Sequence, residues 1–109
     1  MERLPVLYVV GPVSGYHNDN RQNFEAVREK LQKSGYKVII PHDGIKPGTP
    51  AHIALRVSLV NMLSKAHGVA VLDGRWSSHI ASIEIATARD CEMPIKKVSE
   101  WIHYARPRD

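Results

Sequence analysis

Short apolar runs alternate with longer segments of helical periodicity along the whole chain. The runs cover residues 5–10, 36–40, 69–72 and 93–96. The segments with apolar residues at helical spacing cover residues 20–34, 50–66, 78–91 and 98–105. This β-α-β-α-β-α-β-α order predicts a parallel sheet, because parallel strands are joined by crossover helices. We therefore expect one α/β domain over residues 1–109, with a doubly wound sheet of about four to five strands between two layers of helices.

Three loops follow the carboxyl ends of the first three predicted strands. They cover residues 11–16, 41–48 and 73–79, and they are rich in glycine, proline and serine. Ligands of doubly wound sheets bind outside the carboxyl ends of the strands. The sequence therefore predicts a binding site on this edge of the sheet.

One carboxylate interrupts the apolar helix predicted over residues 78–91. Glu84 lies among isoleucines and alanines, and a buried acid costs free energy unless it is paired or used. Side chains on a helix lean toward its amino end, which directs Glu84 toward the predicted site. Tyr8, inside the first strand, is a candidate partner for its carboxylate. The alternative is a structural glutamate held in an internal pair.

The loop from Gly11 to Gly15 lies between a strand and a helix. Its glycines allow the backbone to approach an anion, and its free N–H groups can bind phosphate. The same residues also suit a simple turn. Ser78 is expected to cap its helix and to add a hydroxyl to the same edge.

Composition restricts the other classes of function. The net charge is +4, which favours an anionic partner. The basic residues are scattered, however, and no basic stripe contains aromatic residues. We therefore expect a small anionic ligand and regard nucleic acid as an unlikely partner. No apolar run is long enough for a membrane span. The single cysteine, Cys91, suits a reducing cytoplasm. The six histidines show no metal-binding spacing, so no metal is expected.

Several motifs, taken in order, resemble the nucleoside 2-deoxyribosyltransferase superfamily. The closest part of that group is its small, phage- and prophage-rich branch, and the resemblance covers about residues 6–95. The residues that carry it are Tyr8, Gly11-Pro12-Val13-Ser14-Gly15, Asn23-Phe24, Gly35-Tyr36, Val38, Pro41, Gly74, Ser78, Ala81 and Glu84.

The resemblance implies a flavodoxin-like or Rossmann-like fold and an oligomeric enzyme that acts on the N-glycosidic bond of a nucleoside or its 5′-monophosphate. It implies that Glu84 is the nucleophile that attacks C1′ and that Tyr8 orients it. It also implies that the loop with Gly11, Pro12, Ser14 and Gly15, together with Ser78, binds the 5′-phosphate. No metal or organic cofactor is implied.

Three positions carry residues that differ from the family pattern, and the tryptophan that follows Gly74 is displaced by one position, to Trp76. Ser58 and His67 stand where the family has aspartates, and Ile80 stands where it has a glycine beside the path of the sugar. An acid that protonates the leaving base must then come from elsewhere. The candidates on the predicted edge are Asp43, Asp73 and His79, and each of them also suits a turn or an exposed position.

These departures leave three functions open. The first is an N-glycosidase or deoxyribosyltransferase, the second is a catalytically impaired protein that binds a nucleotide or another phosphorylated metabolite, and the third is a protein-interaction module. The helices over residues 50–66 and 78–91 have apolar residues on more than one face, which predicts a homo-oligomer through them.

Overall fold

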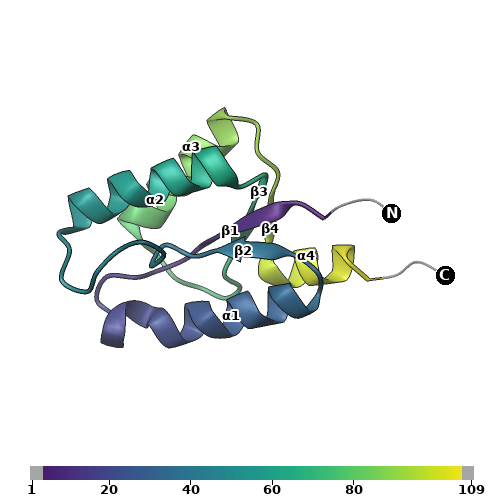
Figure 1. Ribbon diagram of the computed structural model, residues 1–109, viewed down its shortest axis with the longest axis horizontal. Helices are drawn as coiled ribbons and strands as arrows, with labels where there is room; N and C mark the ends of the chain where they lie inside the picture. The colour runs from purple at the N-terminus through teal and green to yellow at the C-terminus, as the bar shows by residue number, and fades with distance from the viewer. Residues whose placement is uncertain (1–3, 107–109) are drawn as a thin grey trace.

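A computed structural model describes residues 4–106, which form one sheet with helices on both faces (Figure 1). The strands are β1 (Val6–Val10), β2 (Lys37–Ile39), β3 (Gly68–Val71) and β4 (Ile95–Lys97). The helices are α1 (Arg21–Lys33), α2 (Ala51–Lys65), α3 (His79–Asp90) and α4 (Val98–Tyr104). A short 3-10 turn, η1 (His17–Asn20), precedes α1 and was not expected from the sequence. The predicted alternation of strands and helices is confirmed.

The four strands are all parallel and lie in the order β2-β1-β3-β4. Tyr8, in the middle of β1, pairs with Ile39 on one side and Val69 on the other. The chain first adds β2 beside β1 and then crosses over to add β3 on the opposite side, so the strand order reverses next to β1. This is the beginning of the flavodoxin-like order, in which ligands bind at the reversal point.

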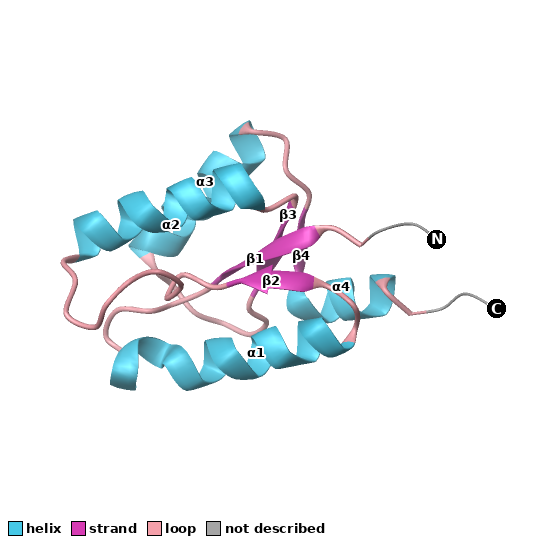
Figure 2. Cartoon of the chain, viewed as in Figure 1, coloured by secondary structure: helices cyan, strands magenta, loops and turns pink. Residues whose placement is uncertain are grey.

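Helices cover both faces of the sheet (Figure 2), and each face buries its own hydrophobic cluster. Leu7 and Val9 face the layer that holds α1 and α4, whereas Tyr8 and Val10 face the layer that holds α2 and α3. Successive residues of a strand point to opposite faces, and β1 is covered on both, so these four side chains are fully buried. The predicted three-layer architecture is confirmed, and it points the ring of Tyr8 toward α3.

Glycine ends α1 in the manner expected from the sequence. Gly35 adopts a left-handed backbone with φ of 105°. Its N–H donates to Gln32 O, and the N–H of Tyr36 donates to Leu31 O, which together form a Schellman motif. The motif reverses the chain so that it enters β2 beside β1.

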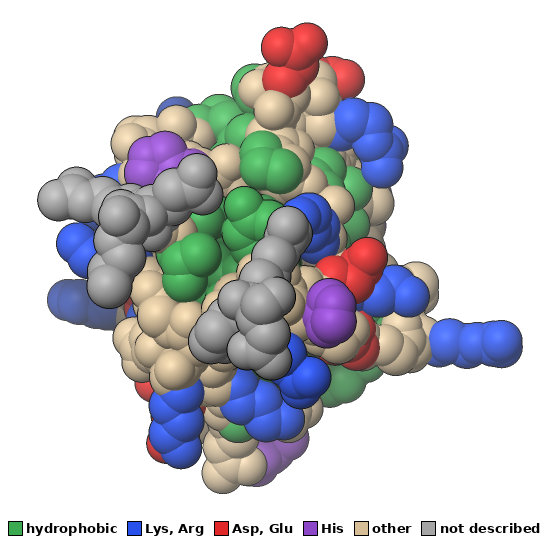
Figure 3. Space-filling view, turned by 90° about the vertical axis from the view of Figure 1, so that its right-hand side faces the viewer, with side chains coloured by type: hydrophobic (Ala, Val, Ile, Leu, Met, Phe, Trp, Pro, Cys, Tyr) green, Lys and Arg blue, Asp and Glu red, His purple; other side chains and the backbone are tan. Residues whose placement is uncertain are grey.

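The described chain begins and ends on the side of the molecule that carries the amino ends of the strands. Figure 3 shows this side, where hydrophobic side chains gather at the centre and basic side chains are spread around them. The loops that follow β1 and β2 lie at the other end (Figure 1). Within residues 4–106, no helix has both the length and the apolar character that a membrane crossing requires.

Candidate active site

A tyrosine on β1 and a glutamate on α3 form a buried pair. The hydroxyl of Tyr8 donates a hydrogen bond to Oε2 of Glu84. Glu84 is only 2% exposed, and Tyr8 is fully buried. The contact arises because α3 packs over β1 and because the alternation of β1 turns Tyr8 to that face. The contact expected between these two residues is therefore present.

The surroundings of Glu84 set the protonation of the pair. Burial raises the pKa of Glu84, and the hydroxyls of Tyr8 and Ser58 oppose this rise only in part. Burial and the neighbouring Glu84 also raise the pKa of Tyr8, so that the phenol keeps its proton and remains a donor. No basic side chain within residues 4–106 forms an ion pair with Glu84. The carboxylate is therefore held by the hydroxyl of Tyr8, without an ion-pair partner among the described residues.

A cavity of about 120 Å³ opens beside this pair. Its walls come from the loop after β1 (Gly11, Val13, Ser14), from η1 and the start of α1 (Asp19, Arg21), from the loop after β2 (residues 41, 42 and 45–49), from α2 (residues 51, 54, 55 and 58) and from the start of α3 (Ser78, Ile80, Glu84). These segments follow or flank the carboxyl ends of the strands, so the site lies on the predicted edge. The cavity is smaller than the ~300 Å³ at which typical small-molecule pockets begin, and this chain alone encloses only part of a ligand the size of a nucleotide.

Charge is distributed unevenly along the cavity. Glu84 is buried, whereas Arg21 is half-buried and Lys46 is exposed. Among the residues that the structure describes, neither of these two cations forms an ion pair. The exposed Asp19 is the other acid in the wall. A ligand with an electrophilic carbon at its inner end and an anionic group toward solvent matches this pattern.

The predicted phosphate loop contributes only some of its residues to the cavity. Gly11 and Ser14 line it, while Pro12 and Gly15 are not part of its wall. The carbonyl of Pro12 instead accepts a hydrogen bond from Asn20 Nδ2 at 2.8 Å. Ser78 has both expected positions: its Oγ accepts from Ala81 N at 3.2 Å, and the residue lines the cavity.

Close packing explains why residue 11 is a glycine. A Cβ atom at Gly11 would lie 2.4 Å from Cδ1 of Leu72, which directly follows β3. Real Cβ atoms do not approach a neighbour so closely. The glycine therefore allows the chain after β1 to pass against the chain after β3.

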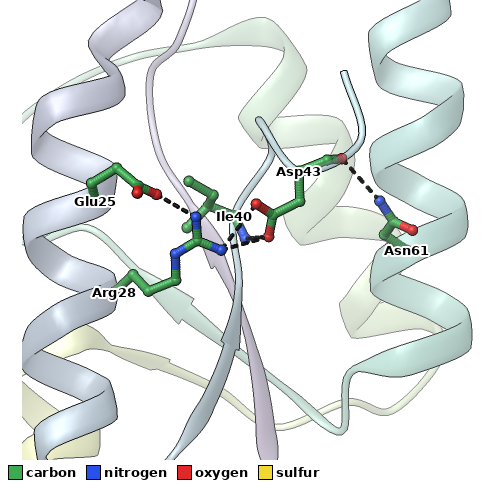
Figure 4. A network of polar contacts seen from close by, with 5 residues as sticks. All are labelled: Glu25, Arg28, Ile40, Asp43 and Asn61. Atoms are coloured by element: carbon green, nitrogen blue, oxygen red, sulfur yellow. Dashed lines mark hydrogen bonds and ion pairs between the residues drawn. The ribbon is translucent and has the colours of Figure 1, made fainter. Parts of the chain in front are cut away.

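The three candidates for a general acid do not reach the cavity. Asp73 accepts hydrogen bonds from the N–H and the hydroxyl of Ser99, at 3.1 and 2.8 Å, and so binds the start of α4. His79 lies in a separate shallow hollow at the start of α3. Asp43 is turned toward α1, where both of its oxygens accept from Arg28 Nη1 (Figure 4). The structure therefore does not bring any of the three into the cavity wall beside Glu84, and the identity of the general acid stays a prediction.

Two of the three positions that depart from the family pattern form part of the cavity wall. Ser58 lies on α2, where its hydroxyl donates to Leu55 O at 3.0 Å. Ile80 narrows the cavity next to Glu84 but leaves it open. His67 lies at the opposite edge of the sheet, where its Nδ1 accepts from the N–H of Val6 at 3.2 Å.

Sequence reasoning missed His42, Arg21 and Lys46. His42 lines the cavity and is only 8% exposed, although it belongs to a loop rich in glycine and proline. A signal for it was present, because the residue follows the second strand by two positions and so lies at the carboxyl edge of the sheet. The two cations lie in segments that are distant in sequence, and only the folded chain shows that they share a wall.

Comparison with known proteins gives a family but no function. Searches of the curated proteins and of the solved structures find no match. Within residues 4–106, no three side chains of His, Cys, Asp or Glu are grouped so that they could hold a metal ion. Residues 5–97 match a family described as a domain of unknown function (DUF4406), and the chain therefore belongs to this family.

Proposed function

We propose that the protein cleaves or transfers the N-glycosidic bond of a nucleoside 5′-monophosphate or a nucleoside. The observation that carries the proposal is the position of Glu84, a buried carboxylate that has no ion-pair partner within residues 4–106, receives a hydrogen bond from Tyr8 and lines a cavity. A purely structural glutamate would need only the Tyr8 hydroxyl, whereas Glu84 also forms part of a cavity wall. A nucleophile needs this combination, because its carboxylate must be oriented and must remain available to a substrate.

In the proposed reaction the sugar enters the cavity with C1′ next to Glu84. The carboxylate attacks C1′ as the bond to the base nitrogen breaks, and the base leaves with the electron pair of that bond. The base takes a proton from solvent water, because Asp43, Asp73 and His79 do not line the cavity and Asp19, the other acid in the wall, is exposed to solvent. Water then hydrolyses the glycosyl ester, or a second base replaces water and the reaction becomes a transfer. Tyr8 keeps its proton and orients the carboxylate throughout.

The outer part of the cavity supports the choice of a monophosphate. Arg21 and Lys46 lie in the wall without an ion-pair partner among the described residues, and Ser14 and Ser78 line the same cavity. Arginine, lysine and hydroxyl groups are common ligands of phosphate. Because this chain encloses only a small volume, we expect the base to extend out of the cavity.

The test is incubation of the protein with a panel of nucleosides and their 5′-monophosphates while free base is followed by chromatography. Glu84→Gln keeps an oxygen for Tyr8 but removes the nucleophile, and it is expected to lower the rate by at least about 10³-fold. Glu29→Gln changes an exposed acid of α1 and serves as the matched control. If no base is released, or if Glu84→Gln keeps full activity, the proposed reaction is wrong.

A second function is favoured by Ser58 and Ile80 in the cavity wall. Without an acid at position 58 and with a branched side chain beside Glu84, the same site suits a protein that binds a nucleotide without cleaving it. Calorimetry with the same panel separates the two functions. Binding without release of base supports a sensor or a sequestering protein.

The outer surface of α2 supports the proposal of a homo-oligomer. Val60 is 64% exposed, Leu63 46% and Ile53 36%, which is unusual for three large apolar side chains on one helix. A second copy of the chain that packs on α2 and α3 would bury them. Analytical ultracentrifugation of the wild type and of Val60→Glu tests this, since the charged variant is expected to shift the protein toward the monomer.

The single cysteine leads us to place the proposed glycosidase activity in a reducing cytoplasm.

A further inference from the structure

His42, which lines the cavity, contains a buried polar atom that has no hydrogen-bond partner among residues 4–106. Among the buried side-chain nitrogens and oxygens of residues 4–106, only Nδ1 of His42 has no hydrogen-bond partner. The side chain is more than nine-tenths buried and belongs to the cavity wall. Buried polar atoms are almost always paired, so an unpaired one at a binding site indicates that a ligand supplies the partner.

The other ring nitrogen shows what kind of partner is missing. Nε2 of His42 lies 2.7 Å from the carbonyl oxygen of Asp19. A carbonyl oxygen can only accept a hydrogen bond, so Nε2 carries the hydrogen. In a neutral imidazole the second nitrogen is then an acceptor. The ligand must therefore bring a donor to Nδ1.

The backbone that holds Nε2 has an uncommon conformation. Asn18, Asp19 and Asn20 are all left-handed, with φ of 51°, 54° and 60°. Asparagine and aspartate tolerate this region better than other side-chain-bearing residues, but they usually do so singly, and three in succession are uncommon. Strained backbone of this kind is retained mainly where it positions a functional group. Here it turns the carbonyl of Asp19 toward His42.

The ring is also fixed from two further directions. Phe24 meets it edge to face, with the ring centroids 5.0 Å apart. The next residue, Asp43, accepts from Arg28 and from the N–H of Ile40 and so fixes the start of the loop (Figure 4). Protein contacts therefore surround the ring on several sides and leave Nδ1 without a partner.

We infer that Nδ1 of His42 accepts a hydrogen bond from a hydroxyl group of the sugar, which makes His42 a residue that selects the sugar. This inference rests on the proposed function, which places a sugar in the cavity beside Glu84. A sugar hydroxyl is the donor that the buried part of a nucleotide brings to such a wall. Nδ1 itself is buried, so this contact requires the ring to turn toward the cavity, and side-chain rotamer changes are common when a ligand binds.

The test compares four ligands that differ only in their hydroxyls. They are adenosine 5′-monophosphate and its 2′-deoxy, 3′-deoxy and 2′,3′-dideoxy forms, and their affinities are measured by calorimetry in the Glu84→Gln background, which does not consume them. Loss of the contacted hydroxyl is expected to weaken binding about tenfold. Equal affinity for all four ligands overturns the inference without any further variant.

Two substitutions of His42 separate contact with the ligand from structural support. His42→Gln places an amide nitrogen near the position of Nε2, so it can still donate to Asp19, but it has no atom in place of Nδ1. This variant is expected to bind the four ligands within about twofold of one another. His42→Asn keeps a polar atom near the position of Nδ1 and is expected to retain the preference. Circular dichroism checks that both variants are folded.

The outcomes distinguish this inference from the proposed function. If His42→Gln keeps the wild-type preference among the four ligands, His42 has only a structural role, and the proposed reaction is unaffected. If the ligands bind with the expected preference but the wild type never releases base, the reaction is wrong and the role of His42 stands. If none of the four ligands binds, the inference about His42 is overturned for adenine nucleotides, while the proposed reaction is still decided by release of base from the wider panel.

Discussion

The hydroxyl of Tyr8 donates to the carboxylate of Glu84, a residue 76 positions later in the chain. The bond joins the central strand to α3 inside the hydrophobic layer between them. Because burial keeps the proton on the phenol and raises the pKa of the glutamate, ionisation of this pair occurs at Glu84. Both the activity and the stability of the protein are therefore expected to depend on the protonation of this carboxylate.

Glu84→Gln is expected to make the folded protein more stable than the wild type at pH 8. Burial raises the pKa of Glu84 above its ordinary value of 4.5, so the folded chain holds this proton more tightly than the unfolded chain. The resulting stability is complete below the unfolded pKa and is lost as the pH rises through the folded pKa. Glutamine does not ionise, so the variant does not lose this stability. Its free energy of unfolding relative to the wild type therefore increases by at most about 1.4 kcal/mol per pH unit between the unfolded and the folded pKa of Glu84.

Urea unfolding of both proteins between pH 4 and pH 8 measures this difference. Glu29→Gln serves as the control because residue 29 is exposed on α1. A difference between Glu84→Gln and the wild type that stays constant over the whole range would contradict the prediction.

Tyr8→Phe is expected to move the pH profile of the reaction to higher pH. The Tyr8 hydrogen bond lowers the pKa of Glu84, so its removal raises that pKa further and reduces the ionised fraction at neutral pH. The buried carboxylate also loses a donor, which is expected to cost about 1–3 kcal/mol of unfolding free energy. Initial rates from pH 5 to pH 9 and urea unfolding provide the two measurements. Tyr104→Phe, at an exposed tyrosine, should change neither.

Arg28 and Asp43 are expected to show a favourable coupling energy of about 0.5–1 kcal/mol in a double-mutant cycle with Arg28→Met and Asp43→Asn. Nη1 of Arg28 donates to both oxygens of Asp43, at 2.9 and 2.8 Å, and both side chains are partly shielded from solvent. The more exposed Lys33–Glu29 pair, at 3.3 Å, is the matched control and should give almost no coupling. Faster hydrogen exchange in residues 41–48 of the variants would show that the pair holds this loop. If the Arg28–Asp43 and Lys33–Glu29 pairs gave equal coupling energies, other contacts would have to hold the loop of residues 41–48.

Arg21→Gln is expected to weaken the binding of a nucleoside 5′-monophosphate about tenfold and to leave the binding of the unphosphorylated nucleoside nearly unchanged. The reason is the position of this guanidinium in the cavity wall. Calorimetry at two salt concentrations provides the measurement, and the salt dependence should be weaker in the variant. Arg89→Gln changes an exposed arginine in the last turn of α3 and is the control. An equal loss for both ligands would place Arg21 outside the phosphate site.

Gly11→Ala is expected to destabilise the protein by about 1–3 kcal/mol, because the added methyl group would overlap the side chain of Leu72. Leu72→Ala in the same chain removes the overlapping atoms, so the double variant should lose less stability than the two single variants together. Thermal unfolding of the four proteins gives the coupling energy. Strict additivity would show that Leu72 is not the obstacle.

The order of elements was predictable because each depends on a local pattern. Strands β1 and β3 are continuous apolar runs, as expected for strands that are buried on both faces, and α3 begins at a serine that caps it. The pair of Tyr8 and Glu84 was also predictable, because the alternation of a strand and the direction of side chains on a helix limit where each points.

The directions of loop side chains were not predictable from local patterns. Asp43 faces Arg28, which lies 15 positions earlier, and Asp73 faces Ser99, which lies 26 positions later. In each case the partner comes from another element, and nothing near the aspartate indicates it. His42 shows the same limit, since its burial depends on Phe24 and on the left-handed turn before α1.

The close packing of Gly11 and Leu72 changes how the motif of residues 11–15 should be interpreted. The first glycine leaves space for the side chain of Leu72, so packing at this edge of the sheet accounts for it without any ligand. The choice of ligand then depends on side chains that line the cavity, such as Arg21, His42 and Lys46.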